Sequence, residues 1–105
     1  MIIERATFRI RPGQDDAFQA AFREAAGVIS GADGLGSVRL AHGVEHPGTY
    51  LALLEWDSVD DHVRFRSSER FGTWAGLLRP HYAAPPEAEH YTIVVETLPS
   101  DRSDV

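Results

Sequence analysis

The sequence contains no cysteine among its 105 residues. A disulfide framework, a thiolate nucleophile and a zinc–thiolate site are therefore excluded. No apolar run approaches the roughly 20 residues that a helix needs to cross a membrane. The first residues also lack the basic and then apolar pattern of a signal peptide. We therefore expect a cytoplasmic protein without a membrane partner.

Positive charge is also scarce, because 10 basic residues face 16 acidic residues and the formal net charge is −6. A nucleic-acid partner would require a basic surface, so none is expected. The glycine-rich run GADGLG lacks the lysine of a phosphate-binding loop, and no serine-centred catalytic turn is present. The buried stretch carries no closely spaced histidine pair on one element, and we expect neither a metal nor another cofactor.

Hydrophobic periodicity predicts four strands and two helical regions. Alternating apolar and polar residues indicate a strand at 2–10, and Val38 and Leu40 indicate a second at about 38–41. The runs at 49–56 and 90–98 are strands with apolar residues on both faces. A helix over about 14–29 repeats apolar residues on one face. A second helical region begins after Ser58, a good N-cap residue, and ends at Pro80. The resulting order, βαββαβ, predicts a ferredoxin-like α+β fold whose four-stranded antiparallel sheet carries helices on one face.

The whole pattern predicts a single domain over 1–98 and a polar C-terminal tail over 99–105. The strands at 49–56 and 90–98 are apolar on both faces, although two helices can cover only one face of the sheet. A large exposed apolar surface is rare on a monomer. We therefore predict a homodimer in which two copies of the sheet pack against each other, forming a dimeric α+β barrel.

Two histidines are the candidate catalytic residues. On the helix after Ser58, His62 lies in the middle of an apolar arc with Val59, Val63, Phe65 and Arg66. The expected topology has strands one and three parallel and strand four antiparallel to both. The start of that helix and the start of strand four, at His90, then lie at the same end of the domain. The alternative is that His62 is a core histidine with both ring nitrogens hydrogen-bonded.

Six further residues are candidates for binding a substrate near these histidines. The aromatic ones either line a pocket or belong to the core, and Arg66 either binds an anion or pairs with a neighbouring acid. These residues are Trp74, Arg66, Phe65, Tyr82, Tyr50 and Trp56. Glu4 falls on the apolar face of the first strand, as an edge residue or a buried carboxylate.

The chain resembles the antibiotic biosynthesis monooxygenase family of dimeric α+β barrel proteins. The residues that carry the resemblance are EWDS at 55–58, DDH at 60–62, FRSSERF at 65–71, Trp74, Arg79-Pro80 and PPEAEHY at 85–91. With Pro12-Gly13 in the first turn, the likeness covers roughly residues 1–98. The haem-degrading members use three residues whose counterparts here are Ala6, Phe65 and Ala75, so the resemblance implies no haem.

The resemblance implies a cofactor-independent monooxygenase that oxidises a small aromatic or quinol with O2 in a pocket between sheet and helices. On this reading His62 or His90 is the base or a hydrogen-bond partner, and Arg66 holds the developing anion. Two alternatives remain open. One is a non-catalytic dimeric protein that binds a small molecule, and the other is an isomerase or decarboxylase that uses histidine acid–base chemistry.

Overall fold

The computed structural model describes residues 1–97. The predicted strand end at Leu98 and the predicted tail at 99–105 therefore lie outside the described residues. The elements follow the order β1 (Ile2–Arg9), α1 (Asp15–Ile29), β2 (Leu35–His42), β3 (Thr49–Trp56), α2 (Val59–Arg66), α3 (Glu69–Leu78), the 3-10 turn η1 (Arg79–His81) and β4 (Glu87–Tyr91).

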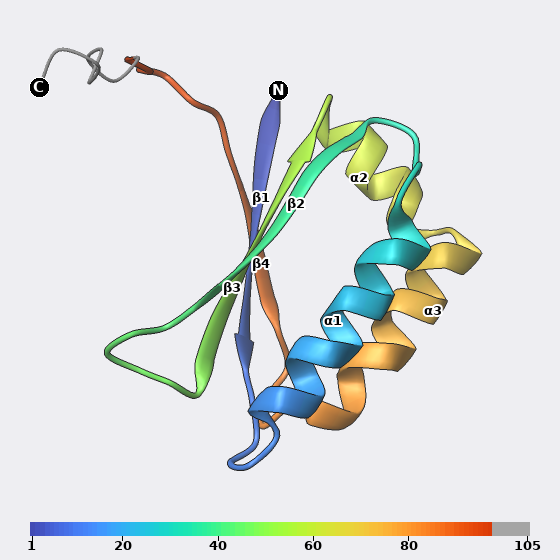
Figure 1. The fold of residues 1–105 in the computed structure, drawn as a ribbon. Helices are drawn as coiled ribbons and strands as arrows, with labels where there is room; N and C mark the ends of the chain where they lie inside the picture. The colour runs from blue at the N-terminus through green and yellow to red at the C-terminus, as the bar shows by residue number, and fades with distance from the viewer. Residues whose placement is uncertain (98–105) are drawn as a thin grey trace, which may run out of the picture.

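The strands form one antiparallel sheet in the order β2-β3-β1-β4, and α1 and α3 lie side by side on one face of it (Figure 1). This two-layer arrangement confirms the predicted ferredoxin-like α+β fold. None of the helices within residues 1–97 is long and apolar enough to cross a membrane.

The core lies between the sheet and the two long helices. Every second residue of β3 is buried, starting at Tyr50 and ending at Trp56, because alternate side chains of a strand point to opposite faces. The predicted apolar stripe of α1 packs onto this face, with Phe18, Ala25 and Ile29 fully buried. The other residues of β3, including Leu51 and Leu53, are only half-buried on the face that no helix covers.

The helix that carries the first histidine begins as predicted. The Ser58 Oγ accepts a hydrogen bond from the Asp61 backbone N–H at 3.2 Å, which caps α2. However, α2 has only 8 residues, and only His62 and Phe65 on it are buried. The predicted inward arc is therefore wrong for Val59 and Val63, which are 38% and 50% exposed.

Two predictions about the strands are also wrong. Strands β1 and β3 are antiparallel, as are β1 and β4, so β3 and β4 run in the same direction. The last strand covers Glu87–Tyr91 in place of 90–98. Tyr91 pairs with Ile3, close to the first residue of β1, so the neighbouring strand offers almost no backbone beyond this point. Residues 92–97 form no strand and leave the sheet (Figure 1).

Candidate active site

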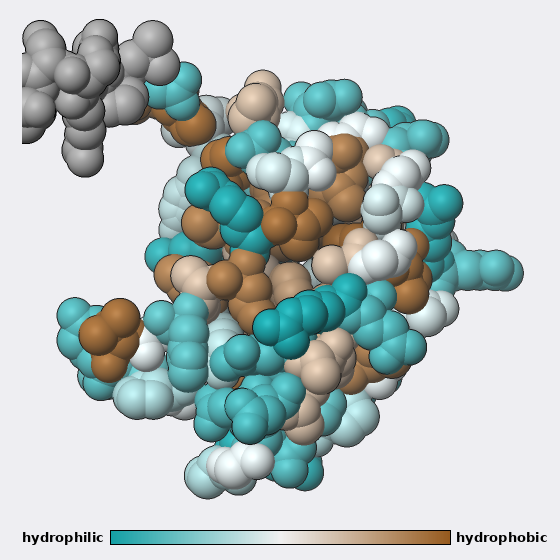
Figure 2. Space-filling model, in the orientation of Figure 1, coloured by the Kyte–Doolittle hydropathy of each residue, from teal (hydrophilic) through white to brown (hydrophobic). Residues whose placement is uncertain are grey.

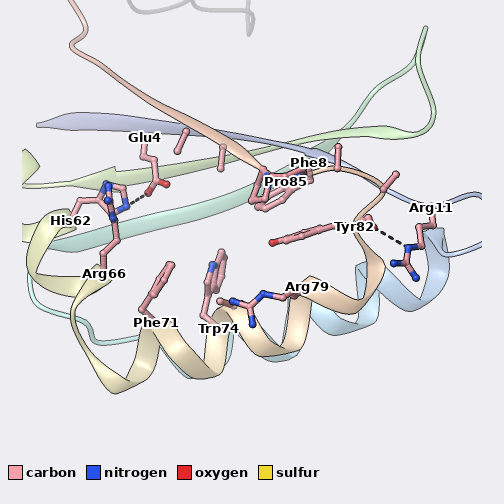
Figure 3. A pocket seen from close by; sticks show the side chains of 16 residues that line it. Glu4, Phe8, Arg11, His62, Arg66, Phe71, Trp74, Arg79, Tyr82 and Pro85 are labelled. Carbon is pink, nitrogen blue, oxygen red and sulfur yellow. Dashed lines mark hydrogen bonds and ion pairs between the residues drawn. The ribbon is translucent and has the colours of Figure 1, made fainter.

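A cavity of about 610 Å³ lies between the helix-covered face of β1, the edge strand β4, α3 and the loop that follows η1. Aromatic side chains form much of its wall, namely Phe8, Phe71, Trp74 and Tyr82 (Figure 3). Most binding sites for small organic molecules are concave, mainly apolar and equipped with a few convergent polar groups. The cavity has this composition.

One end of the cavity is formed by a buried cluster of polar side chains around Glu4. The Trp56 Nε1–H donates a hydrogen bond to Glu4 Oε1 at 2.9 Å, and His62 Nε2 lies 3.3 Å from the same oxygen (Figure 3). On its other side, His62 Nδ1 shares a hydrogen bond of 2.7 Å with His90 Nε2. The indole of Trp56 stacks on the His62 ring with their centroids 5.2 Å apart. These contacts fix both rings and the carboxyl group.

Burial decides the charge of this cluster. It raises the pKa of Glu4 above its usual value. The Trp56 hydrogen bond and the electrostatic effects of His90 and Arg66 act in the opposite direction and lower this pKa. Burial, together with the smaller effects of His90 and Arg66, lowers the pKa of His62 to about 4. At neutral pH His62 is therefore an uncharged imidazole, and its contact with Glu4 is not a salt bridge.

Three arginines contribute to the cavity wall. Arg66 lies near the Glu4 end, and Arg79 and Arg11 lie toward the loop after η1 (Figure 3). The Arg11 Nε–H donates to the carbonyl oxygen of Tyr82 at 2.9 Å, which ties the turn after β1 to that loop. Burial raises the pKa of the Tyr82 hydroxyl to about 12, so this phenol stays uncharged and acts as a polar wall.

Four of the predicted site residues line the cavity, namely His62, Arg66, Trp74 and Tyr82. His90 does not line it, but it contacts His62 from the edge strand. Three predicted ligand-binding residues lie elsewhere. The ring of Phe65 packs between Trp56 and Phe71 in the core, with centroids 5.4 Å and 5.7 Å away. Trp56 is 1% exposed and reaches the cavity only through its hydrogen bond to Glu4.

Tyr50 belongs to a separate surface groove between α1 and β2. Its hydroxyl donates to Asp15 at 2.9 Å and accepts from Gln19 at 2.9 Å, and its ring stacks on His42 with centroids 4.1 Å apart. The groove also exposes apolar side chains of Ala26, Val38 and Leu40. Tyr50 is thus separate from the cluster around Glu4.

The two histidines meet for a different reason from the one predicted. Because β3 and β4 run in the same direction, their last residues lie at the same end of the sheet, beside the start of β1. His62 follows the end of β3, and His90 lies near the end of β4 in place of its start, directly opposite Glu4 in the register. The wrong strand direction and the wrong start of β4 compensate each other.

Glu4 is the residue of this cluster that was not predicted as a site residue. The available signal was a carboxylate at an inward position of an alternating strand, where an unpaired charge is costly. The described residues hold no group of three or more histidine or acidic side chains placed to bind a metal ion.

The sequence profile of the antibiotic biosynthesis monooxygenase family matches residues 1–77 of the chain. The chain is also 37% identical over 92 residues to YczJ, an uncharacterised protein of Bacillus subtilis, covering 87% of this chain and 97% of YczJ. The chain belongs to this monooxygenase family. Membership confirms the resemblance that the motifs at 55–91 carry.

Solved structures agree with this family membership. A Bordetella bronchiseptica protein assigned to the same family superimposes with a TM-score of 0.86 at 33% identity, covering 90% of this chain and 97% of that protein. SnoaB of Streptomyces nogalater, a cofactor-independent oxygenase, superimposes with a TM-score of 0.77 at 20% identity, covering 94% of this chain and 97% of SnoaB. At that identity, the similarity to SnoaB shows the fold alone.

Proposed function

We propose that the protein is a cofactor-independent monooxygenase that oxidises a small aromatic or quinol substrate with O2. The observation that carries the proposal is the aromatic-walled cavity of about 610 Å³ with a titratable cluster at one end. Family membership, and the activity that the name of SnoaB gives to a protein of the same fold, support it.

The chemistry needs an acid–base group and a largely dry cavity. The cluster around Glu4 takes a proton from an electron-rich phenol or an activated CH2 group, and the resulting anion reduces O2. In the oxidation of an anthrone CH2 to a carbonyl, one oxygen atom enters the product and the other leaves as water, so the proton returns to the departing oxygen. The side chain of Arg66 holds the developing negative charge of the substrate.

Oxygen consumption tests this proposal directly. With a panel of hydroquinones and anthrones, we expect uptake of one O2 for each product molecule and no accumulation of H2O2. His62→Ala removes the imidazole that supports the buried cluster, and its turnover should fall at least ~100-fold, the usual range for loss of acid–base catalysis. The matched control is His42→Ala, which removes a histidine stacked on Tyr50 outside the cavity.

The alternatives give different results in the same assay. A protein that only binds aromatic ligands would show an increase in Tm with them but no O2 uptake. An isomerase or decarboxylase would form product under anaerobic conditions, which the proposed oxygenase cannot do. The absence of turnover above the uncatalysed rate across the panel would contradict the proposal.

A further inference from the structure

We propose that Glu4 is the group that accepts the proton of the ligand, that His62 and His90 position its carboxylate, and that the ligand is an uncharged weak acid such as a phenol. The choice of a phenol rests on the proposed function. The assignment of Glu4 rests on the geometry of the cluster and is tested without turnover.

The tautomer of His62 determines which of its ring nitrogens can accept a proton. A neutral imidazole has one N–H and one nitrogen lone pair. With Glu4 ionised, the His62 nitrogen that lies 3.3 Å from Oε1 must carry the hydrogen, because a lone pair facing a carboxylate oxygen is repelled. The lone pair then belongs to Nδ1, where it accepts the N–H of His90 at 2.7 Å. His62 therefore has no free lone pair to take a proton from a ligand.

The two oxygens of the Glu4 carboxyl group have different surroundings. Trp56 and His62 both approach Oε1, and the other oxygen has no hydrogen bond among the described residues. Figure 3 shows this second oxygen directed away from His62 and toward the cavity. Glu4 lines the cavity, is 7% exposed and is held from two sides. Its raised pKa makes it a stronger base than an ordinary carboxylate, which suits proton transfer near neutral pH.

The charge of Glu4 determines which ligands can enter this end of the cavity. An ionised Glu4 repels an anionic group at this end of the cavity and attracts a hydrogen-bond donor, so the ligand enters uncharged. When the phenol O–H bond breaks, the proton forms an O–H bond with Glu4 and the negative charge moves to the phenolate oxygen. The summed charge of Glu4 and the ligand does not change, and Arg66 attracts the anion before and after the transfer.

The tautomer of His62 decides the assignment of Glu4. Nitrogen-15 NMR of histidine-labelled protein at neutral pH should show hydrogen on Nε2, a lone pair on Nδ1, and a scalar coupling to His90 Nε2 across the hydrogen bond. Carbon-13 NMR should show Glu4 as ionised and titrating above its ordinary pKa. The opposite tautomer of His62, with a protonated Glu4 donating to Nε2, would overturn the proposal.

A chromogenic phenol tests the ligand class. The probe is 4-nitrophenol, buffered well below its pKa in water, with its methyl ether 4-nitroanisole as the matched ligand. We expect the wild-type protein to bind 4-nitrophenol as phenolate without releasing a proton to the buffer, as calorimetry in two buffers will measure. The ether, which has no proton to transfer, should bind at least ~10-fold more weakly, the loss of about one hydrogen bond to a charged group.

Glu4→Gln keeps the shape of the side chain and an oxygen for Trp56 but cannot take the proton. In this variant, any phenolate that forms should release one proton to the buffer. Glu89→Gln is the matched control, because this carboxylate of β4 pairs with Arg5 outside the cavity, and it should behave as wild type. Phenolate formation by Glu4→Gln without proton release would place the proton on a histidine and overturn the proposal. If 4-nitrophenol does not bind, the phenolic ligand class fails while the tautomer still decides the role of Glu4.

Discussion

The buried imidazole of His62 makes the stability of the fold depend on pH. Burial, His90 and Arg66 lower its pKa from 6.5 to about 4 in the folded protein. The unfolded chain therefore binds a proton more readily. The stability that His62 contributes is fully present above a pH of about 6.5 and is lost as the pH falls toward 4, and the loss is at most about 3 kcal/mol.

Glu4 contributes with the opposite sign, because its folded pKa is raised and its ionisation weakens the folded state as the pH increases. We therefore compare Glu4→Gln with the double variant Glu4→Gln/His62→Gln. Urea unfolding at several pH values between 7 and 4 measures the stability of both variants. As the pH falls, Glu4→Gln should lose the stability that His62 contributes, and the double variant should not. The same pH dependence in both proteins would contradict the low pKa of His62.

For single residues, the sequence predicted burial better than side-chain contacts. The periodicity identified His62 as inward, and it is 4% exposed. It could not identify Trp56 as the hydrogen-bond donor to Glu4, because the two residues are 52 positions apart and meet only through the register that pairs β1 with β3. Long-range side-chain contacts of this kind depend on strand order, which local patterns do not contain.

At the scale of the element, the first turn of α2 holds His62 in place. Ser58 caps this helix through the Asp61 N–H, so Ser58→Ala should lower the free energy of unfolding by about 1 kcal/mol. Urea denaturation measures the change. Ser37→Ala is the control, because Ser37 is exposed on β2, and it should change stability by less than about 0.5 kcal/mol. An equal effect of both substitutions would show that the cap does not stabilise α2.

The strongly periodic elements were predictable and the last strand was not. The apolar run TYLALLEW predicted the bounds of β3, Thr49–Trp56, and one face of this strand is buried along its whole length. The run from Tyr91 to Val95 has the composition of a strand, yet the structure ends β4 at Tyr91. Composition reports the tendency of a segment to pair, but pairing also requires a partner, and β1 ends beside Tyr91.

For the whole molecule, two surfaces support the predicted homodimer. The side of the sheet opposite the helices carries the half-buried Leu51 and Leu53, and the Arg5 Nε on this sheet is a buried donor without a partner among the described residues. Beyond β4, Ile93, Val94 and Val95 are 53%, 87% and 78% exposed, and Figure 2 shows apolar surface beside the start of the grey segment. A second copy that covers the sheet would bury these apolar side chains.

We expect the protein to sediment as a dimer and Leu51→Glu to sediment as a monomer. Leu51 lies between Thr7 and Ala41 in the register, so a glutamate there remains solvated in a monomer but has no basic residue opposite it within the sheet. Burying this charge between two sheets would cost several kcal/mol. Val44→Glu, at a position 87% exposed in the loop between β2 and β3, should remain dimeric.

Sedimentation velocity across a range of concentrations measures the mass of all three proteins. A wild-type protein that is monomeric throughout, or a dimeric Leu51→Glu, would show that the open face of the sheet is not the interface.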